Sequence, residues 1–198
     1  AKTPVTNAQY AEFVRDSVLV KSPKRWQGDE PPPDKLNHSV VEVSWHDAVA
    51  YCKWLAAITS NPYRLPSEAE WEKGARGTDE RIYPWGNHWD AKRCNTLEGG
   101  KGGTTPVGVY PGGASPYGLL DMAGNVWEWC RDWYAEDFYT RSQNTEPFCN
   151  DPQSGLCVLR GGGWYSHHSY VRCASRYRSP PCYSDDQLGF RVAAFPSI

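Results

Sequence analysis

The chain has 198 residues, of which 39% are hydrophobic and 22% charged, and its formal net charge is −2. These proportions exclude a disordered tail and a fibre, and a chain of this size can bury a core of its own, so a single domain over residues 1–198 is predicted. No basic stretch interleaves with aromatic residues and no apolar run approaches the roughly 20 residues of a membrane span, which predicts no nucleic-acid partner and no membrane span.

Three amphipathic helices are predicted in the first half of the chain, each after a capping residue. Thr6 precedes the first, Ser44 with Asp47 forms a capping box before the second, and Ser67 with Glu70 does so before the third. The apolar spacing places the helices at residues 7–14, 48–58 and 71–75.

After Gly77 the helical period is absent, and short apolar runs alternate with Gly, Pro and Asn. This pattern predicts short strands linked by ordered loops. The runs are residues 106–110, 126–129, 158–160 and 190–193. The chain also holds 10 Trp and 12 Tyr beside 18 Gly and 16 Pro, which indicates loops fixed in place by large rings. The predicted class is α+β with much ordered loop.

Seven cysteines leave at least one thiol without a partner in the chain. Cys149 and Cys157 flank a turn-rich segment, so either a local disulfide or two buried free thiols are expected there. The cysteines do not fix the compartment. The first residues lack the charged-then-apolar pattern of a signal peptide, so the expectation leans to the cytoplasm.

Six motifs follow one another in the order of a known family. They are PVTNAQY (4–10), VSWHDA (43–48), YRLPSEAEWE (63–72), GNVWEW (124–129), LRGGGW (159–164) and GFR (189–191). In this order they resemble the formylglycine-generating-enzyme domain, also called the sulfatase-modifying-factor domain. The resemblance implies a C-type-lectin-like fold with two main helices beside a small antiparallel sheet. It also suggests that some N-terminal sequence of the family precedes residue 1.

The resemblance bears on catalysis through two cysteines. In sulfatase-activating members, two cysteines shortly after the Gly-Gly motif bind copper and oxidise a substrate cysteine, and those positions fall on Ser166 and Val171 here. Neither side chain can act as a thiolate, so we expect no catalytic copper and no enzyme activity. The alternative is a copper-dependent formylglycine-generating oxidoreductase that acts on a peptide cysteine through Cys173 or Cys182.

Residues 165–187 carry neither hydrophobic period and consist largely of Tyr, Ser, His and Asp. These residue types have codons that end in a pyrimidine, and most are reached from an Asn codon by changing adenines. The segment resembles the variable region of diversity-generating retroelement variable proteins, which is displayed on this same scaffold. The candidate ligand-binding residues are Tyr165, Ser166, His167, His168, Ser169, Tyr170, Ser175, Tyr177, Ser179, Cys182, Tyr183, Ser184, Asp185 and Asp186.

The resemblance therefore predicts a non-catalytic domain that binds a protein or cell-surface ligand through residues 165–187. Tyrosine suits this role because it offers large, rigid contact area, and Ser and Asp add adaptable hydrogen bonds. Two other interpretations stay open: a Tyr- and Ser-rich surface loop without a special history, and a structural module fused to a signalling or protease domain.

A structural calcium ion is the expected cofactor. Two carboxylates, Asp121 and Glu128, flank a Gly-Asn turn, and hard oxygen ligands of this kind suit Ca²⁺. The resemblance assigns the ligands to Asp121, Gly124, Val126 and Glu128. A second family calcium site would use Asn95, but the loop after it lacks the required Asp. Without an ion, we expect Glu128 to pair with a loop amide or an arginine.

Overall fold

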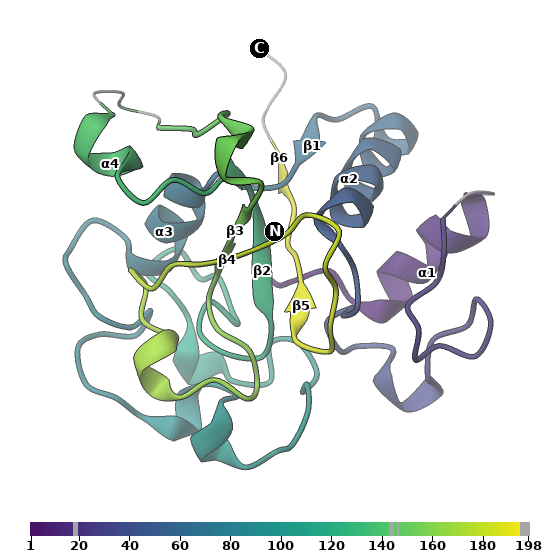
Figure 1. The fold of residues 1–198 in the computed structure, drawn as a ribbon. Helices are drawn as coiled ribbons and strands as arrows, with labels where there is room; N and C mark the ends of the chain where they lie inside the picture. The colour runs from purple at the N-terminus through teal and green to yellow at the C-terminus, as the bar shows by residue number, and fades with distance from the viewer. Residues whose placement is uncertain (18–19, 143–144, 146, 195–198) are drawn as a thin grey trace.

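The computed structural model describes residues 1–17, 20–142, 145 and 147–194, and its fold is shown in Figure 1. The α-helices are α1 (Asn7–Asp16), α2 (Trp45–Thr59), α3 (Glu68–Arg76) and α4 (Phe138–Arg141). Six 3₁₀ turns lie in the loops: Pro33–Lys35, Ala91–Arg93, Leu97–Gly99, Pro111–Gly113, Pro152–Ser154 and His168–Tyr170. The three predicted helices are confirmed. The domain thus has three main helices, where the resemblance implied two.

The capping residues set where the helices begin. Ser44 Oγ accepts a hydrogen bond from Asp47 N, and the Asp47 carboxylate accepts one from Ser44 N, so α2 begins at the next residue, Trp45. The same reciprocal pair between Ser67 and Glu70 starts α3. Both helices start three residues earlier than the apolar spacing predicted, because a capping box fixes the first turn whatever its polarity.

The main sheet has the strand order β4-β3-β2-β5. Its strands are β2 (Trp127–Trp133), β3 (Cys157–Arg160), β4 (Tyr177–Ser179) and β5 (Leu188–Gly189). β3 is antiparallel to both neighbours, whereas β5 runs parallel to β2, so the sheet is mixed and the expectation of a purely antiparallel sheet is wrong. β1 (Tyr63–Arg64) and β6 (Ala193–Ala194) form a separate antiparallel pair. In Figure 1, α1 and α2 lie on one side of the main sheet, and α3 and α4 on the other.

Two of the predicted strands differ from the structure. Residues 106–110 form a loop, because Gly108 takes a positive φ of 73° and donates its N–H to the Asp121 carboxylate at 2.7 Å. Within residues 190–193, the Phe190 carbonyl accepts from Val5 N and the Arg191 side chain turns into the core. Only Ala193 of this run belongs to a strand pair, as the first residue of β6.

Aromatic rings fill the core between the helices and the sheet. Tyr10 and Phe13 of α1 contact Tyr51 of α2 at centroid distances of 5.7 and 5.6 Å, and Tyr51 contacts Phe190 at 5.3 Å. The indole of Trp129 in β2 donates to the Val43 carbonyl at 3.0 Å, which ties the loop before α2 to the sheet. These contacts confirm that large rings fix the long irregular segments in place.

All seven cysteines are free thiols, so the local disulfide between Cys149 and Cys157 is not formed. Cys182 is exposed and the other six are buried. Burial raises the pKa of Cys173 to about 12. In the part of the chain that the structure describes, none of the helices is long and apolar enough to span a membrane.

Candidate functional site

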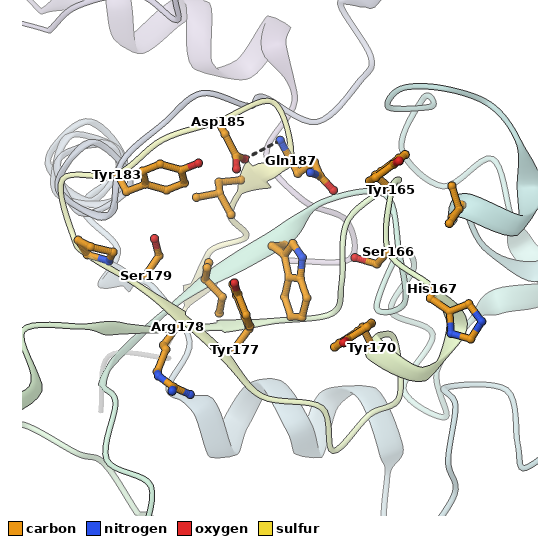
Figure 2. A pocket seen from close by; sticks show the side chains of 15 residues that line it. Tyr165, Ser166, His167, Tyr170, Tyr177, Arg178, Ser179, Tyr183, Asp185 and Gln187 are labelled. Atoms are coloured by element: carbon orange, nitrogen blue, oxygen red, sulfur yellow. Dashed lines mark hydrogen bonds between the residues drawn. The ribbon is translucent and has the colours of Figure 1, made fainter.

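A cavity of about 700 Å³ opens over one face of the main sheet, and Figure 2 shows the side chains around it. The floor takes one residue from each strand: Trp127 from β2, Leu159 from β3, Tyr177 from β4 and Leu188 from β5. The walls come from the loops on either side of β4. The remaining lining residues are Leu97, Tyr165, Ser166, His167, Tyr170, Arg178, Ser179, Pro180, Tyr183, Asp185 and Gln187.

Four tyrosines of the segment 165–187 are exposed around this cavity. The exposed fractions are 61% for Tyr165, 56% for Tyr170, 51% for Tyr177 and 49% for Tyr183. The ring of Tyr177 lies against the indole of Trp127, with the centroids 5.2 Å apart. Tyr165, Tyr170 and Tyr183 line the same cavity, as Figure 2 shows. The tyrosines are therefore available to a ligand and are not part of the packed interior.

The backbone of the segment is anchored to the scaffold at several points. The carbonyl of Pro181 accepts from Trp45 N at 3.1 Å, and the carbonyl of Asp185 accepts from Glu42 N at 2.8 Å, which joins the segment to the start of α2. The indole of Trp164 donates to the Asp186 carbonyl at 3.0 Å and so closes the segment on itself. The side chains around the cavity are thus displayed on a fixed backbone.

The predicted binding residues divide into two groups. Those that line the cavity are Tyr165, Ser166, His167, Tyr170, Tyr177, Ser179, Tyr183 and Asp185. Those that the structure places outside its lining are His168, Ser169, Ser175, Cys182, Ser184 and Asp186. Ser175 is 8% exposed and donates to the Ser169 carbonyl, and Asp186 forms an ion pair with Arg25 at 2.9 Å. These two side chains serve the scaffold.

Several lining residues were not predicted. Trp127 and Leu159 lie in two of the six family motifs, and Arg178 is not among the candidate binding residues. Leu97 comes from a distant loop, which its backbone hydrogen bond to the Ser166 carbonyl at 3.1 Å brings beside the segment. Side chains alternate between the two faces of a strand, so the sequence could have placed Trp127 on one face of the sheet. No local pattern predicts that Leu97 lies at the cavity, because only the fold brings its loop there.

Ser166 and Val171, the positions that the resemblance assigns to the copper-binding cysteines, lie beside one another at Gly162. A Cβ placed on Gly162 would come within 2.4 Å of Val171 Cγ1 and 3.4 Å of Ser166 Cβ. Ser166 lines the cavity and its hydroxyl accepts from Gly163 N at 3.0 Å, whereas Val171 is fully buried. The two positions are therefore neighbours, and of the two only Ser166 reaches the cavity.

Glu128, the proposed fourth calcium ligand, is fully buried and holds three hydrogen bonds. Arg191 Nε donates to its Oε2 at 2.6 Å and Arg191 Nη2 to its Oε1 at 2.8 Å, while the indole of Trp71 donates to Oε2 at 2.7 Å. This is the pairing with an arginine that was the alternative to calcium. Because each carboxylate oxygen accepts two bonds, Oε1 keeps one position for a cation.

The remaining groups at the turn are oxygen atoms suited to calcium. Asp121 is buried, and burial raises the pKa of its carboxyl. Asn95, which the resemblance assigns to the second calcium site, has its Oδ1 buried without a hydrogen-bond partner, and its backbone forms a β-bridge with Gly124. The donor set fits calcium, and an ion held by Asp121, Gly124, Val126 and Glu128 stays a prediction.

Curated relatives cover most of this chain. The formylglycine-generating enzyme of Thermomonospora curvata is 40% identical over an alignment of 214 positions, gaps included. The alignment covers 92% of this chain and 68% of that protein. The formylglycine-generating enzyme of Mus musculus is 40% identical over an alignment of 193 positions. This alignment covers 85% of this chain and 48% of the mouse protein. The serine/threonine-protein kinase pkn1 of Chlamydia caviae is 42% identical over 163 residues, which are 25% of its length. The chain thus spans about half of the mouse relative and a quarter of the kinase.

Solved structures share the fold. PvdO from Pseudomonas aeruginosa superposes with a TM-score of 0.84 at 25% identity, over 98% of this chain and 78% of that one. Treponema denticola variable protein 1 superposes with a TM-score of 0.79 at 24% identity, over 98% of this chain and 83% of that one. These superpositions confirm the predicted C-type-lectin-like α+β fold. They also confirm that the fold is similar to that of a variable protein.

The prediction that this chain is not an enzyme is wrong. It rested on Ser166 and Val171 alone, and it is contradicted by relatives at about 40% identity that are named formylglycine-generating enzymes. The absence of two thiols from two neighbouring positions does not decide whether a domain with this scaffold has activity.

The family predicted from the six motifs is confirmed. The family model described as "Sulfatase-modifying factor enzyme 1-like domain" matches residues 1–195, nearly the whole chain. This match and the 40% identical relatives lead to one conclusion. The chain belongs to the family of sulfatase-modifying factor enzyme 1-like domains.

Proposed function

We propose that this domain binds a protein or cell-surface ligand through the cavity lined by residues 165–187. The observation that carries the proposal is the set of four exposed tyrosines around one cavity of about 700 Å³. Tyrosine rings supply large contact area at a small cost in side-chain entropy, and buried tyrosines dominate many interfaces. An open, ring-lined hollow suits a loop or side chain that projects from a macromolecule.

We further propose that the exposed positions of this segment vary between copies of the protein, as in diversity-generating retroelement variable proteins. The contacts support this because the segment is anchored through backbone groups of Pro181, Asp185 and Asp186, which any side chain leaves in place. A near-copy of the gene that differs only at adenines within this segment would support variation. A near-copy that differs elsewhere, or at other bases, would contradict it.

The binding proposal is tested with a variant in which Tyr165, Tyr170, Tyr177 and Tyr183 are all changed to Ala. Wild-type protein is first panned against a displayed random-peptide library and against purified cell-envelope proteins to obtain ligands. The variant should keep its circular dichroism spectrum and its cooperative unfolding, and should lose at least about 2 kcal/mol of binding free energy for those ligands.

The matched control changes Tyr117 and Val109, which are 55% and 51% exposed and do not line the cavity. Their change to Ala should leave ligand binding unaltered. If the four-tyrosine variant unfolds, or if it binds as tightly as the control, the cavity is not the ligand site.

The second candidate function is copper-dependent formation of formylglycine on a peptide cysteine, and the relatives of that name favour it. The assay incubates the protein with copper, oxygen and a cysteine-containing peptide, and detects the aldehyde by mass spectrometry. Aldehyde formed by wild-type protein supports this function. The variant Ser166→Cys/Val171→Cys places two thiols beside Gly162 and should gain Cu(I) binding, because soft thiolate ligands select Cu(I).

A further inference from the structure

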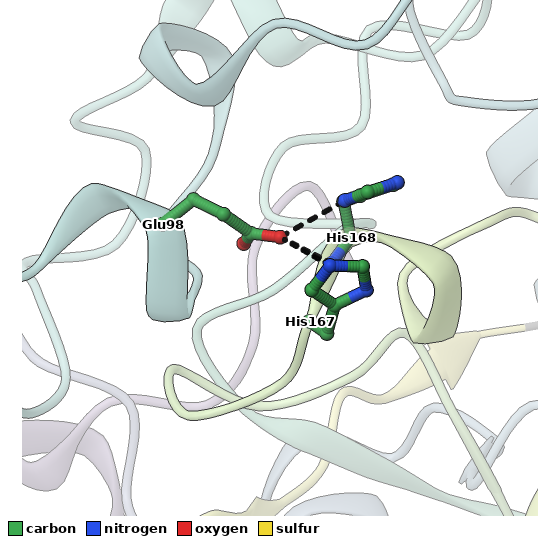
Figure 3. A group of neighbouring side chains, drawn as sticks. All are labelled: Glu98, His167 and His168. Carbon is green, nitrogen blue, oxygen red and sulfur yellow. Dashed lines mark hydrogen bonds and ion pairs between the residues drawn. The ribbon is translucent and has the colours of Figure 1, made fainter.

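Two histidines and a glutamate meet at the rim of the cavity, as Figure 3 shows. Glu98 Oε1 lies 3.0 Å from His168 Nδ1 and 3.5 Å from His167 Nε2. Glu98 belongs to the 3₁₀ turn Leu97–Gly99, about 70 residues before the histidines. The fold therefore brings three potential ligand atoms within 4.8 Å of one another.

The spacing matches the ligand shell of a zinc-like ion. With metal–ligand bonds of about 2.0–2.1 Å in a tetrahedral arrangement, neighbouring ligand atoms lie roughly 3.3 Å apart. The two measured distances from the glutamate oxygen, 3.0 and 3.5 Å, lie on either side of this value. Two imidazoles and one carboxylate are also a ligand set of zinc sites that keep one coordination position open.

The surroundings hold the three side chains in position. The backbone N–H of His168 donates to Glu98 Oε1 at 2.8 Å, and the His168 ring lies 5.2 Å from the ring of Trp89. His167 Nδ1 lies 3.1 Å from the Ser169 hydroxyl and accepts from Ser169 N at 3.4 Å, so its Nε2 faces the glutamate. These contacts orient the ring, as groups around a metal-bound histidine do.

Hydrogen bonds hold the Glu98 carboxylate in place beside the two histidines. Burial by itself would raise the pKa of Glu98, but the hydrogen bond from the backbone of His168 and those from its own backbone and Thr96 outweigh it. Together they lower this pKa to about 2.

We propose that Glu98, His167 and His168 bind a divalent transition-metal ion of the zinc type at the rim of the ligand cavity. His167 also lines the cavity, so the ion would face it. Three protein ligands leave at least one coordination position open, and an oxygen or nitrogen atom of a bound ligand can fill that position. Metal binding at this site does not depend on the proposed protein ligand, and the two can fail separately.

Isothermal titration of the metal-free protein with Zn²⁺ alone tests the site. Wild-type protein should bind one equivalent. His167→Ala and Glu98→Gln should each lower the affinity at least about tenfold, since even the loss of groups that only support a metal ligand costs that much. His46→Ala is the matched control, because His46 is an exposed histidine outside the cluster. This control should bind as the wild type does.

The exposed Cys182 could also bind the metal ion. The absorption spectrum of bound Co²⁺ distinguishes a site at Cys182 from the site at Glu98, His167 and His168. Nitrogen and oxygen ligands give only weak visible bands, whereas a thiolate adds an intense near-ultraviolet charge-transfer band. Weak visible bands that disappear in His167→Ala support the proposal. It is overturned by an absence of stoichiometric binding, by a thiolate band, or by unchanged affinity in folded His167→Ala and Glu98→Gln. Circular dichroism of each variant establishes that it is folded.

Discussion

Among the described residues, two buried arginines each form a network with carboxylates. Arg191 and Glu128 form one, with two hydrogen bonds between guanidinium and carboxylate and a third from Trp71. Arg160 forms the other: it is fully buried, pairs with Glu72 and lies 3.7 Å from Glu68. In both networks each charge faces an opposite charge and several polar groups, which offsets the cost of removing it from water.

Arg191→Ala should lower the free energy of unfolding by about 3–5 kcal/mol, because Glu128 would remain buried without its opposite charge. Urea denaturation measures the change. Arg15→Ala serves as the comparison: Arg15 is paired with Glu12 at the surface, where water screens the pair, so its loss should have a much smaller effect. Equal effects of the two changes would contradict the buried pairing.

The thiols should differ sharply in reactivity. Burial raises the pKa of Cys52, Cys94 and Cys157 to about 12, so these thiols stay protonated at pH 8 and are shielded from reagents. Ellman's reagent at pH 8 should modify Cys182 alone in the folded protein and all seven cysteines in denaturant. Cys182→Ser should abolish the fast reaction. A second fast thiol would show that one of the buried cysteines is accessible.

At the scale of elements, the segment 165–187 combines exposed and buried positions without regular alternation. Tyr170 is 56% exposed, whereas Val171 is fully buried and Ser175 is 8% exposed. Apart from β4 and the 3₁₀ turn His168–Tyr170, the segment is loop, in which Val171 and Ser175 pack on the scaffold while Tyr170 faces the cavity. Composition alone does not separate the two kinds, because Ser occurs in both.

A pair of substitutions in the segment tests this division. Tyr170→Ser should change the free energy of unfolding by no more than about 0.5 kcal/mol, because its ring faces solvent. Ser175→Tyr should cost about 1–3 kcal/mol or prevent folding, because a ring does not fit at a buried serine. Thermal unfolding of both variants measures the difference, and a tolerated Ser175→Tyr would contradict the buried position.

The turn at residues 121–128 carries the calcium prediction. The melting temperature should be higher in excess calcium than in the presence of a chelator. The expected rise is about 2–4 °C for each kcal/mol by which bound calcium stabilises the folded state. Asp121→Asn removes one charged ligand and should abolish the calcium-dependent part of the shift. An identical melting temperature in calcium and in chelator would contradict a calcium ion at this turn.

At the scale of the whole molecule, the two ends of the chain meet beside the sheet. Val5 donates to the Phe190 carbonyl and accepts from Val40 N, both at 2.9 Å, and β1 pairs with β6. Gly189 of β5 lies where these segments cross, and a Cβ there would be 2.6 Å from the Val40 carbonyl oxygen. The close approach of three backbone segments at Gly189 locks the ends to the centre of the sheet.

Gly189→Ala should therefore destabilise the domain by about 1–3 kcal/mol, since a backbone oxygen must move to admit the methyl group. Gly103→Ala is the control, because a Cβ on Gly103 has no neighbour within 4 Å, and its effect should stay within about 0.5 kcal/mol. Chemical denaturation under identical conditions compares the two. If Gly189→Ala leaves the free energy of unfolding unchanged, the backbone segments at Gly189 can accommodate a methyl group and the close approach does not stabilise the fold.

Much of this organisation could be predicted from local sequence. The three helices were found because Thr6, Ser44 and Ser67 cap them through contacts within three residues. The strands at residues 126–129 and 158–160 were found because a turn signal adjoins each apolar run: Gly124-Asn125 precedes the first and Gly161 follows the second. The strand predicted at residues 106–110 was wrong because a distant carboxylate, Asp121, holds Gly108 in a loop.

By itself, the sequence determined the family, the helices, and the segment whose exposed tyrosines line the cavity, because these depend on local caps and on residue types along a continuous stretch. Only the tertiary structure decided the rest. It set β5 parallel to β2, buried Ser175 within a segment of exposed residues, and placed Trp127 under Tyr177. It also brought Glu98 to His167 and His168. These outcomes join residues far apart in the chain, and packing against the remainder of the fold selects them.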